Sequence, residues 1–271
     1  MKLLLNHLYI VSTPIGNLDD ITLRALEVLK NSDIILCEDT RRSIKLLSHY
    51  KIKKKLIPYH KFNEQKQLKN IIKYSKEGKI LSLVSDAGTP ALSDPGRILV
   101  NECVKNGIQV TPIPGASSII ASLSVSGFKD QFLFYGFLPK TQNEVDKVLT
   151  NLSQNKFTQV FFIPSKKFNF YIDNFKKYFS GRKILIAKEI SKIHESFIRE
   201  YIDNLKTSKT PVKGELTIVI SDKITQDKIF DEKKIVNKVK KYLKKFSLKD
   251  TVNLVLESEN MSRKKIYELC L

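Results

Sequence analysis

The chain has 271 residues, 42% of them hydrophobic, which is enough apolar material for two compact domains and excludes a disordered chain. Its net charge of +19 indicates a polyanionic partner, because clustered lysines gain affinity by releasing counterions from phosphates. Only seven of the 47 basic residues are arginine, so a lysine-rich composition without a binding role is the alternative. The lysines gather at residues 51–55 and 233–245.

Strands and helices alternate along most of the chain. Apolar runs predict strands near residues 8–12, 33–37, 55–58, 79–84 and 108–112, separated by helical patterns. This order predicts a largely parallel sheet wrapped by helices, in an α/β domain over residues 1–118. A second set of strands is predicted near 132–137, 158–163, 183–187, 197–201 and 215–221. We therefore expect a second α/β domain over 119–225, with a ligand in the cleft between the two domains.

Three loops rich in proline and glycine follow predicted strands of the first domain. They read S-T-P-I-G-N at 12–17, S-D-A-G-T-P-A-L-S-D-P-G at 85–96 and T-P-I-P-G-A-S-S at 111–118. The carboxyl ends of strands in an open α/β sheet are where ligands bind, and glycine lets a ligand approach the backbone closely. Each loop alone could be an ordinary turn, but three together predict one shared site. Asp94 and Pro95 are expected to begin a helix that ends at Gly107, and a first helix is expected to take in Leu18 and Ile21.

A fourth segment, E-D-T-R-R at 38–42, places both signs of charge at the end of a predicted strand. Charges at such a position must be paired or functional, so either a structural salt-bridge cluster or a substrate-orienting group is expected.

Helical patterns alone follow residue 229. They predict helices over 229–246, over 248–256 with Ser247 as cap, and from a cap at Ser262 to the end. Residues 226–271 are therefore expected to form a small helical domain. The last two helices could be a helix-turn-helix that contacts nucleic acid, or part of a bundle that packs on the body or on a second subunit.

Several functional classes lack their minimum residues. Cys37, Cys103 and Cys270 form no C-x-x-C pair, and the four histidines show no metal-ligand spacing, so reduced thiols and no metal are expected. No apolar run approaches the roughly 20 residues of a membrane helix, and the apolar start is too short for a signal peptide, so we expect a cytoplasmic protein. The hydrolase elbow G-x-S-x-G and the phosphate loop G-x-x-x-x-G-K are absent.

A set of motifs carries a family resemblance. T-P-I-G-N, E-D-T-R, the H-x-x-N-E stretch from His60, V-S-D-A-G-T-P-x-x-x-D-P-G and P-G-x-S stand in this order, followed by G-F-L-P, K-E-I-S-K-I-H-E and K-G-E. In these residues the chain resembles, from end to end, the ribosomal RNA small subunit methyltransferase I family of the tetrapyrrole-methylase superfamily. The resemblance implies transfer of a methyl group from S-adenosylmethionine to the ribose 2′-oxygen of a cytidine in the decoding region of 16S ribosomal RNA. It implies 16S rRNA or the small ribosomal subunit as partner, and we expect a homodimer.

The resemblance also implies the site residues. The donor would contact the three loops through Pro14, Gly16, Asp86, Gly88, Thr89, Pro90, Gly115, Ala116 and Ser117. The polar candidates for catalysis and for orienting the substrate are Glu38, Asp39, Arg41 and Glu64, with His60 beside them and Arg41 or Arg42 on a phosphate. Positioning is expected to dominate, because methyl transfer needs donor and acceptor in line and water excluded.

One segment departs from the family pattern. After the strand at 158–163 the family shows an aromatic-Glu pair followed by His-Arg, whereas this chain has Phe162, Ile163, Pro164, Ser165 and two lysines, so no role is assigned to 163–167. Two other functions remain open: a small-molecule methylase acting on a tetrapyrrole, and an RNA-binding or assembly protein without enzymatic activity. The S-D-A-G-T-P loop and the surplus of lysine argue against the former, and binding of S-adenosylmethionine would exclude the latter.

Overall fold

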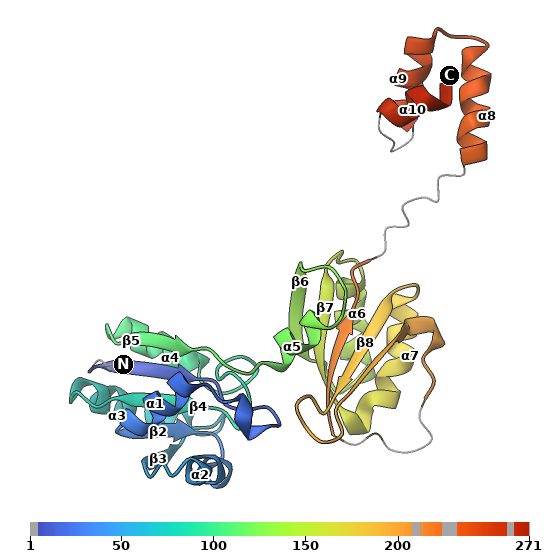
Figure 1. The fold of residues 1–271 in the computed structure, drawn as a ribbon. Coiled ribbons are helices and arrows are strands. Elements are labelled where there is room, and N and C mark those ends of the chain that lie inside the picture. Colours follow the sequence, from blue (N-terminus) through green and yellow to red (C-terminus); the bar gives the residue numbers. More distant parts are fainter. Residues whose placement is uncertain (1–4, 208–211, 213, 224–231, 259–262, 271) are drawn as a thin grey trace. The chain divides into compact units, whose positions relative to one another are not determined.

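The computed structural model describes residues 5–207, 212, 214–223, 232–258 and 263–270 (Figure 1). The chain divides into two compact units, Met1–Lys223 and Ile224–Leu271. The first unit contains two sheets, and the described residues of the second form three helices. The fold is therefore α/β with a small C-terminal helical part, as the sequence predicts, while the domain boundary near residue 118 stays a prediction. Within the described residues, no helix is long and apolar enough to cross a membrane.

The first sheet has five strands, all parallel, in the order β3-β2-β4-β1-β5. Its strands are β1 (His7–Val11), β2 (Ile34–Cys37), β3 (Lys55–Pro58), β4 (Leu81–Val84) and β5 (Gln109–Ile113). All four residues of β2 and of β4 are buried, because these strands lie inside the sheet with helices on both faces. The continuous apolar runs of the sequence thus predict both the strands and their parallel arrangement.

Helices cover the two faces of this sheet (Figure 1). They are α1 (Leu23–Asn31), α2 (Thr40–His49), α3 (Glu64–Lys76) and α4 (Arg97–Lys105). Leu8 and Ile10 pack with apolar residues of α3 and α4, whereas the alternate residues Tyr9 and Val11 pack with α1 and α2. The period of two in a strand therefore divides β1 between two cores.

Two helices begin later than the sequence predicts. The first helix starts at Leu23, because the Thr22 hydroxyl caps it by accepting from the Ala25 N–H at 3.1 Å; Leu18–Asp20 form a separate 3₁₀ turn, η1. Helix α4 starts at Arg97, so Asp94 and Pro95 do not begin it. Its cap is Gly96, whose φ of +138° only glycine readily adopts.

The second sheet also has five strands, in the order β6-β7-β10-β8-β9. These are β6 (Phe132–Phe137), β7 (Thr158–Pro164), β8 (Lys183–Lys188), β9 (Ser196–Tyr201) and β10 (Glu215–Ile220). β6 and β7 are parallel and the other pairs are antiparallel. Helices α6 (Gln142–Ser153) and α7 (Phe168–Phe179) pack on one face around aromatic residues of α7, and α5 (Ser118–Ser124) packs on the other through Ile119.

The C-terminal unit consists of α8 (Glu232–Leu243), α9 (Leu248–Ser258) and α10 (Arg263–Cys270). The three helices share a core of Ile235, Val239, Val252, Val255 and Ile266. The predicted cap of α9 is confirmed, since the Ser247 hydroxyl accepts from the Asp250 N–H at 3.3 Å. The predicted cap at Ser262 lies outside the described residues. The unit is thus a small bundle with a core of its own.

Candidate functional site

The three proline- and glycine-rich loops lie together at the carboxyl ends of β1, β4 and β5. Thr13 and Gly88 form a two-way backbone bridge, with N···O distances of 2.8 and 3.0 Å. The hydroxyls of Ser12 and Thr89 are 2.8 Å apart, and the Thr89 hydroxyl lies 3.5 Å from the Ala116 carbonyl oxygen. The loops therefore form one layer of backbone over the edge of the sheet, at the place where open α/β sheets bind ligands.

A cavity of about 330 Å³ lies against this layer, a size within the range of small-ligand pockets. Its first wall comes from the loops of the first sheet, the first turn of α2 and the start of α5. It consists of Ile15, Arg42, Asp86, Ala87, Gly88, Thr89, Leu92, Ser93, Asp94, Ser117, Ser118 and Ile119. The opposite wall comes from the second sheet and its loops, and consists of Phe137, Phe162, Ile163, Pro164, Ile190, Gly214, Glu215, Leu216 and Thr217. Aromatic and aliphatic side chains thus enclose a small number of polar groups, which is typical of binding pockets.

The predicted donor contacts divide into two groups. Asp86, Gly88, Thr89 and Ser117 line the cavity. The other predicted contacts lie in the same loops but do not line it; they are Pro14, Gly16, Pro90, Gly115 and Ala116. Gly115 sits so close to β1 that a Cβ there would lie 2.8 Å from Ser12 Cβ. The absence of a side chain at Gly115 therefore allows the loop after β5 to pack closely against Ser12, at the end of β1.

Both loops that face each other across the cavity contain strained backbone. Ala91 and Ser93 have φ of +66°, and Glu189 and Ser191 have φ of +51° and +68°. Left-handed backbone is costly for residues with a side chain and persists where the surrounding structure holds it, often at functional sites. The strain on both sides of one cavity supports its assignment as the functional site.

The charged segment at the end of β2 forms a paired cluster beside the cavity. Asp39 caps α2 through the Arg41 N–H at 2.9 Å and accepts a second bond from the Arg41 guanidinium at 2.7 Å. These bonds lower the pKa of Asp39 to about 2. Asp86 accepts from the Asp39 N–H at 3.1 Å and pairs with Arg42 at 3.4 Å, so the cluster joins this segment to the glycine loop. Arg41 stays 86% exposed, and neither it nor Asp39 lines the cavity.

Two other carboxyl groups lie in the same cluster. Burial raises the pKa of Glu38, and the neighbouring Asp86 adds to the effect. Burial likewise raises the pKa of Asp94 to about 6, with contributions from Glu38 and Asp86 that the Ser85 hydroxyl partly offsets. Of these two, only Asp94 lines the cavity. The sequence suggests Asp94 only as a helix cap, so its position at the cavity is a finding of the structure.

The H-x-x-N-E stretch holds two loops in place. The Asn63 side-chain oxygen accepts from the His60 N–H at 2.8 Å, closing the turn after β3. The Glu64 carboxylate accepts from the Gly96 N–H at 2.9 Å. A side chain of α3 thus supplies the hydrogen-bond acceptor for a backbone N–H at the start of α4. Glu64 therefore supports the end of the glycine loop and does not line the cavity.

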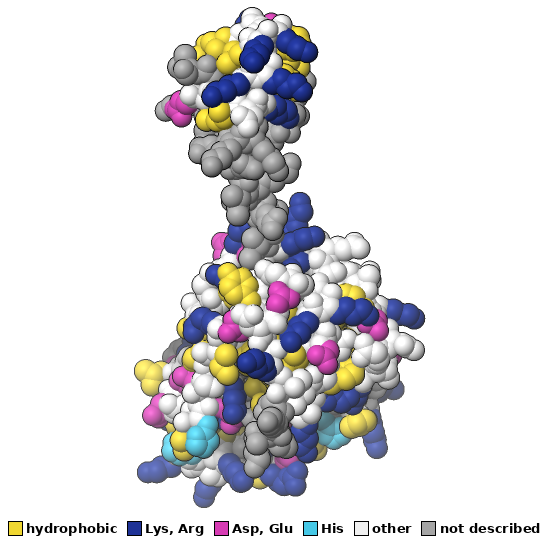
Figure 2. All heavy atoms as spheres, turned by 90° about the vertical axis from the view of Figure 1, so that its right-hand side faces the viewer, with side chains coloured by type: hydrophobic (Ala, Val, Ile, Leu, Met, Phe, Trp, Pro, Cys, Tyr) yellow, Lys and Arg dark blue, Asp and Glu magenta, His cyan; other side chains and the backbone are white. Residues whose placement is uncertain are grey.

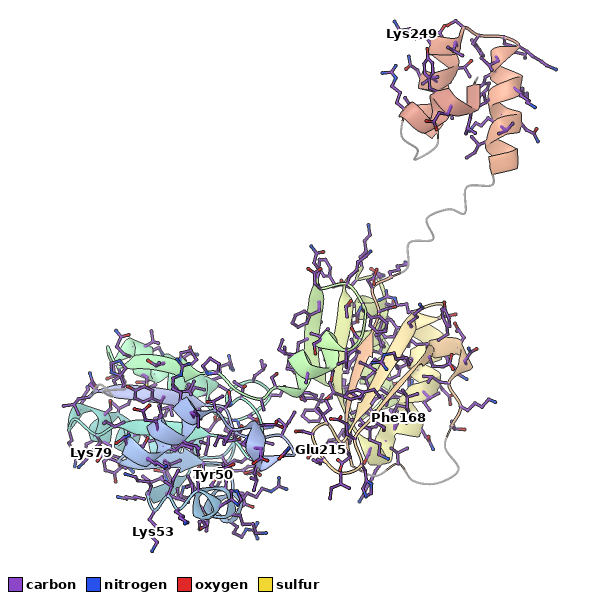
Figure 3. All side chains as sticks on the ribbon, in the orientation of Figure 1. Tyr50, Lys53, Lys79, Phe168, Glu215 and Lys249 are labelled. Carbon is purple, nitrogen blue, oxygen red and sulfur yellow. The ribbon has the colours of Figure 1, made fainter. Side chains whose placement is uncertain are left out.

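The wall from the second sheet includes residues of the K-E-I-S-K-I-H-E and K-G-E motifs, to which the sequence analysis assigns no role. Glu215, at the first position of β10, lies on the side of its sheet that faces the first (Figure 3). The Lys192 ammonium pairs with Glu189 at 3.0 Å and with Glu215 at 3.2 Å, fixing the K-E-I-S-K loop to β10. Ser191 of this loop also hydrogen-bonds to Asp20 of η1. Ile163 and Pro164, in the segment that departs from the family pattern, line the cavity with apolar surface.

No cluster of three or more potential metal ligands occurs among the residues that the structure describes.

Comparison with known proteins gives consistent matches. Residues 7–206 match the family Tetrapyrrole (Corrin/Porphyrin) Methylases. Ribosomal RNA small subunit methyltransferase I of Mesomycoplasma conjunctivae is 45% identical over 213 residues, 78% of this chain and 89% of that relative. The protein of the same name from Rickettsia prowazekii is 40% identical over 270 residues, 97% of this chain and 95% of that relative. Uroporphyrin-III C-methyltransferase from Thermus thermophilus, solved in complex with S-adenyl homocysteine, shares the fold with a TM-score of 0.56 at 16% identity, over 79% of this chain and 97% of that one.

Proposed function

Since the chain belongs to the ribosomal RNA small subunit methyltransferase I family, within the tetrapyrrole methylases, we propose that it methylates the ribose 2′-oxygen of a cytidine in the decoding region of 16S rRNA. The methyl donor is S-adenosylmethionine. The cavity between the two sheets carries this proposal, because it is formed by the same loops that bear the family's motifs.

The residues at the cavity fit such a donor. Gly88, with φ of +79°, leaves the wall without a Cβ, and the Thr89 and Ser117 hydroxyls offer hydrogen bonds to a nucleoside and an amino acid moiety. Ile15, Ile119 and Phe162 provide the apolar surface that an adenine ring requires. The remaining predicted contacts lie in the same loops without lining the cavity; they are Pro14, Gly16, Pro90, Gly115 and Ala116. When bound, the donor supplies a methyl group made electrophilic by a sulfonium.

The acceptor side of the site is the charged cluster after β2. Arg41 is exposed and held in a two-point pair by Asp39, so its guanidinium is preorganised for a phosphate of the RNA. Arg42 reaches the cavity itself. We propose that Asp39 and Arg41 orient the RNA and that Glu38 acts on the same side. Glu64 supports the end of the glycine loop through the Gly96 N–H. Tight positioning is what an in-line transfer demands.

The helical C-terminal unit is proposed to bind RNA. Lys240, Lys241, Lys244, Lys245 and Lys249 are exposed, and Figure 2 shows basic side chains spread over the displayed face of this unit. Such lysines suit phosphate contacts on rRNA or the small subunit, which would place the protein in the cytoplasm. We also propose a homodimer, since the edge strand β6 leaves Phe132 and Tyr135 exposed; sedimentation of the full chain tests it.

The experiment is methyl transfer from labelled S-adenosylmethionine to isolated small subunits, with large subunits and a tetrapyrrole substrate as parallel acceptors. The proposal predicts label in 16S rRNA only. Label in the tetrapyrrole alone would establish the small-molecule methylase instead. A protein that binds small subunits, but shows no heat of binding with the donor in calorimetry, would be an RNA-binding protein without this activity.

A further inference from the structure

The proposed reaction needs a group that accepts the proton of the ribose hydroxyl, and most nearby carboxylates are otherwise engaged. Asp39 is held by Arg41, and Glu64 by the Gly96 N–H. Asp86 accepts from the Asp39 N–H with one oxygen and pairs with Arg42 through the other. Glu215 pairs with Lys192 on the opposite wall. These bonds hold the four carboxylates in place and occupy their oxygens.

Asp94 differs from all of them. It lines the cavity and forms no ion pair among the described residues, and the Ser85 hydroxyl is the hydrogen-bonding neighbour that acts on its charge. It stands between Ser93, which has left-handed backbone, and Pro95, which restricts its own φ. The loop that carries it is anchored at the next residue, because Gly96 donates to Glu64. Asp94 is thus held at the cavity by the backbone, while its carboxyl group remains available.

The groups that face Asp94 favour its protonated form. Burial is the largest influence, followed by the negative charges of Glu38 at the end of β2 and Asp86 in the same glycine loop; only the Ser85 hydroxyl acts in the opposite direction. The pKa of about 6 lies close to the working pH of a cell. A general base is most effective when its pKa is near the working pH, because it is then largely ionised and yet still basic.

We propose that Asp94 is the proton acceptor for the ribose 2′-hydroxyl, an inference that rests on the proposed function. As the hydroxyl oxygen forms its bond to the methyl carbon, the O–H bond breaks and its proton passes to the Asp94 carboxylate. The carbon–sulfur bond breaks at the same time, and its electron pair stays on sulfur as a neutral thioether. Asp94 then releases the proton to solvent, so atoms and charge balance over the cycle.

The first test is the pH dependence of methyl transfer to small subunits under single-turnover conditions. The wild-type rate should rise with pH, reach half of its maximum near pH 6 and level off at higher pH, because only the ionised carboxylate accepts a proton. Asp94→Asn should lower the rate about 100-fold or more and remove this dependence. Asp94→Glu, which keeps a displaced carboxylate, should restore part of the rate. Asp130→Asn, at an exposed aspartate elsewhere in the chain, is the control and should behave as wild type.

The second test does not depend on activity. Because the pKa of Asp94 is raised in the folded protein, ionisation of this group opposes folding, and its cost appears as pH rises through about 4 to 6. Asp94→Asn should therefore match wild type in thermal midpoint at pH 4 and exceed it at pH 7. Partial exposure of the carboxyl screens the cost, so we expect a gain of about 2 to 4 °C. NMR of carboxyl-labelled wild type should show one aspartate, missing in Asp94→Asn, that titrates near pH 6.

The outcomes separate this inference from the proposed function. If wild type methylates small subunits and Asp94→Asn keeps both its rate and its pH profile, Asp94 is not the base. Loss of donor affinity in Asp94→Asn, measured by calorimetry, would place Asp94 on the donor side and overturn the inference, as would a carboxyl that titrates near pH 4. If wild type transfers nothing to small subunits, the proposed function fails, and the inference fails with it whatever the carboxyl titration shows.

Discussion

Gly16 offers a direct test of how the two walls of the cavity meet. Its backbone is not left-handed, so alanine is conformationally acceptable, but a Cβ there would lie 2.6 Å from the Ile190 carbonyl oxygen and 3.0 Å from the Ser191 carbonyl carbon. Both are backbone atoms and cannot rotate away. In Gly16→Ala the loop after β1 and the K-E-I-S-K loop must therefore move apart, and they carry Ile15 and Ile190 of the cavity wall.

The size of the effect follows from the cost of overpacking, about 1 to 3 kcal/mol. If the donor binds only when the two loops are in contact, a cost of about 2 kcal/mol lowers the affinity for the donor about 30-fold. Calorimetry with S-adenosylmethionine measures this, and urea unfolding shows whether the variant is folded. We expect weaker binding with an intact unfolding transition.

Gly78→Ala is the matched control. Gly78 has φ of +81° with no atom within 4 Å of an added Cβ, so alanine there costs about 1 to 2 kcal/mol of backbone strain away from the cavity. It should lower stability and leave donor affinity unchanged. Donor affinity of Gly16→Ala equal to that of wild type would refute the placement of the donor between these loops.

Three further predictions concern separate parts of the site. Gly88→Val should abolish donor binding in a folded protein, because φ of +79° disfavours a β-branched residue at the cavity wall; unchanged binding by calorimetry would move the donor elsewhere. Arg41→Ala and Asp39→Asn should lower turnover while donor affinity stays nearly the same, and loss of donor affinity would reassign them to the donor side. A chain ended after Lys223 should keep donor affinity but bind RNA more weakly, with its log–log salt slope reduced by about 0.7 to 0.9 for each lost phosphate contact. If it is soluble and its RNA affinity and salt slope equal those of the full chain, the lysines of the C-terminal unit do not dock RNA.

Local patterns predict most of the fold. The apolar runs at 34–37 and 81–84 indicate strands that are buried on both faces, which is typical of the central strands of a parallel sheet. The structure buries every residue of both strands. The start of α4 could not be predicted in this way. It depends on Glu64, 32 residues earlier in the chain, which accepts from the Gly96 N–H in place of a local cap.

The cavity shows the same limit. Sequence patterns identify the loops that carry Asp86 and Gly88, because glycine and proline after a strand mark that edge of the sheet. They cannot show that Glu215 and Thr217 line the opposite wall, since this depends on the antiparallel pairing of β10 with β7. Nor do they show which way a charged segment faces: Asp94 reaches the cavity, whereas Asp39 and Arg41 lie beside it.

The position of the transferred methyl group tests the central claim most directly. Small subunits labelled by the protein are digested with alkali, which cleaves RNA through attack of each free 2′-hydroxyl on the neighbouring phosphate. A 2′-O-methyl group blocks that attack, so the label should appear in a single alkali-resistant dinucleotide that begins with cytidine. Label recovered in mononucleotides would mean that a base is methylated, and would contradict the assignment of this cavity to a ribose methyltransferase.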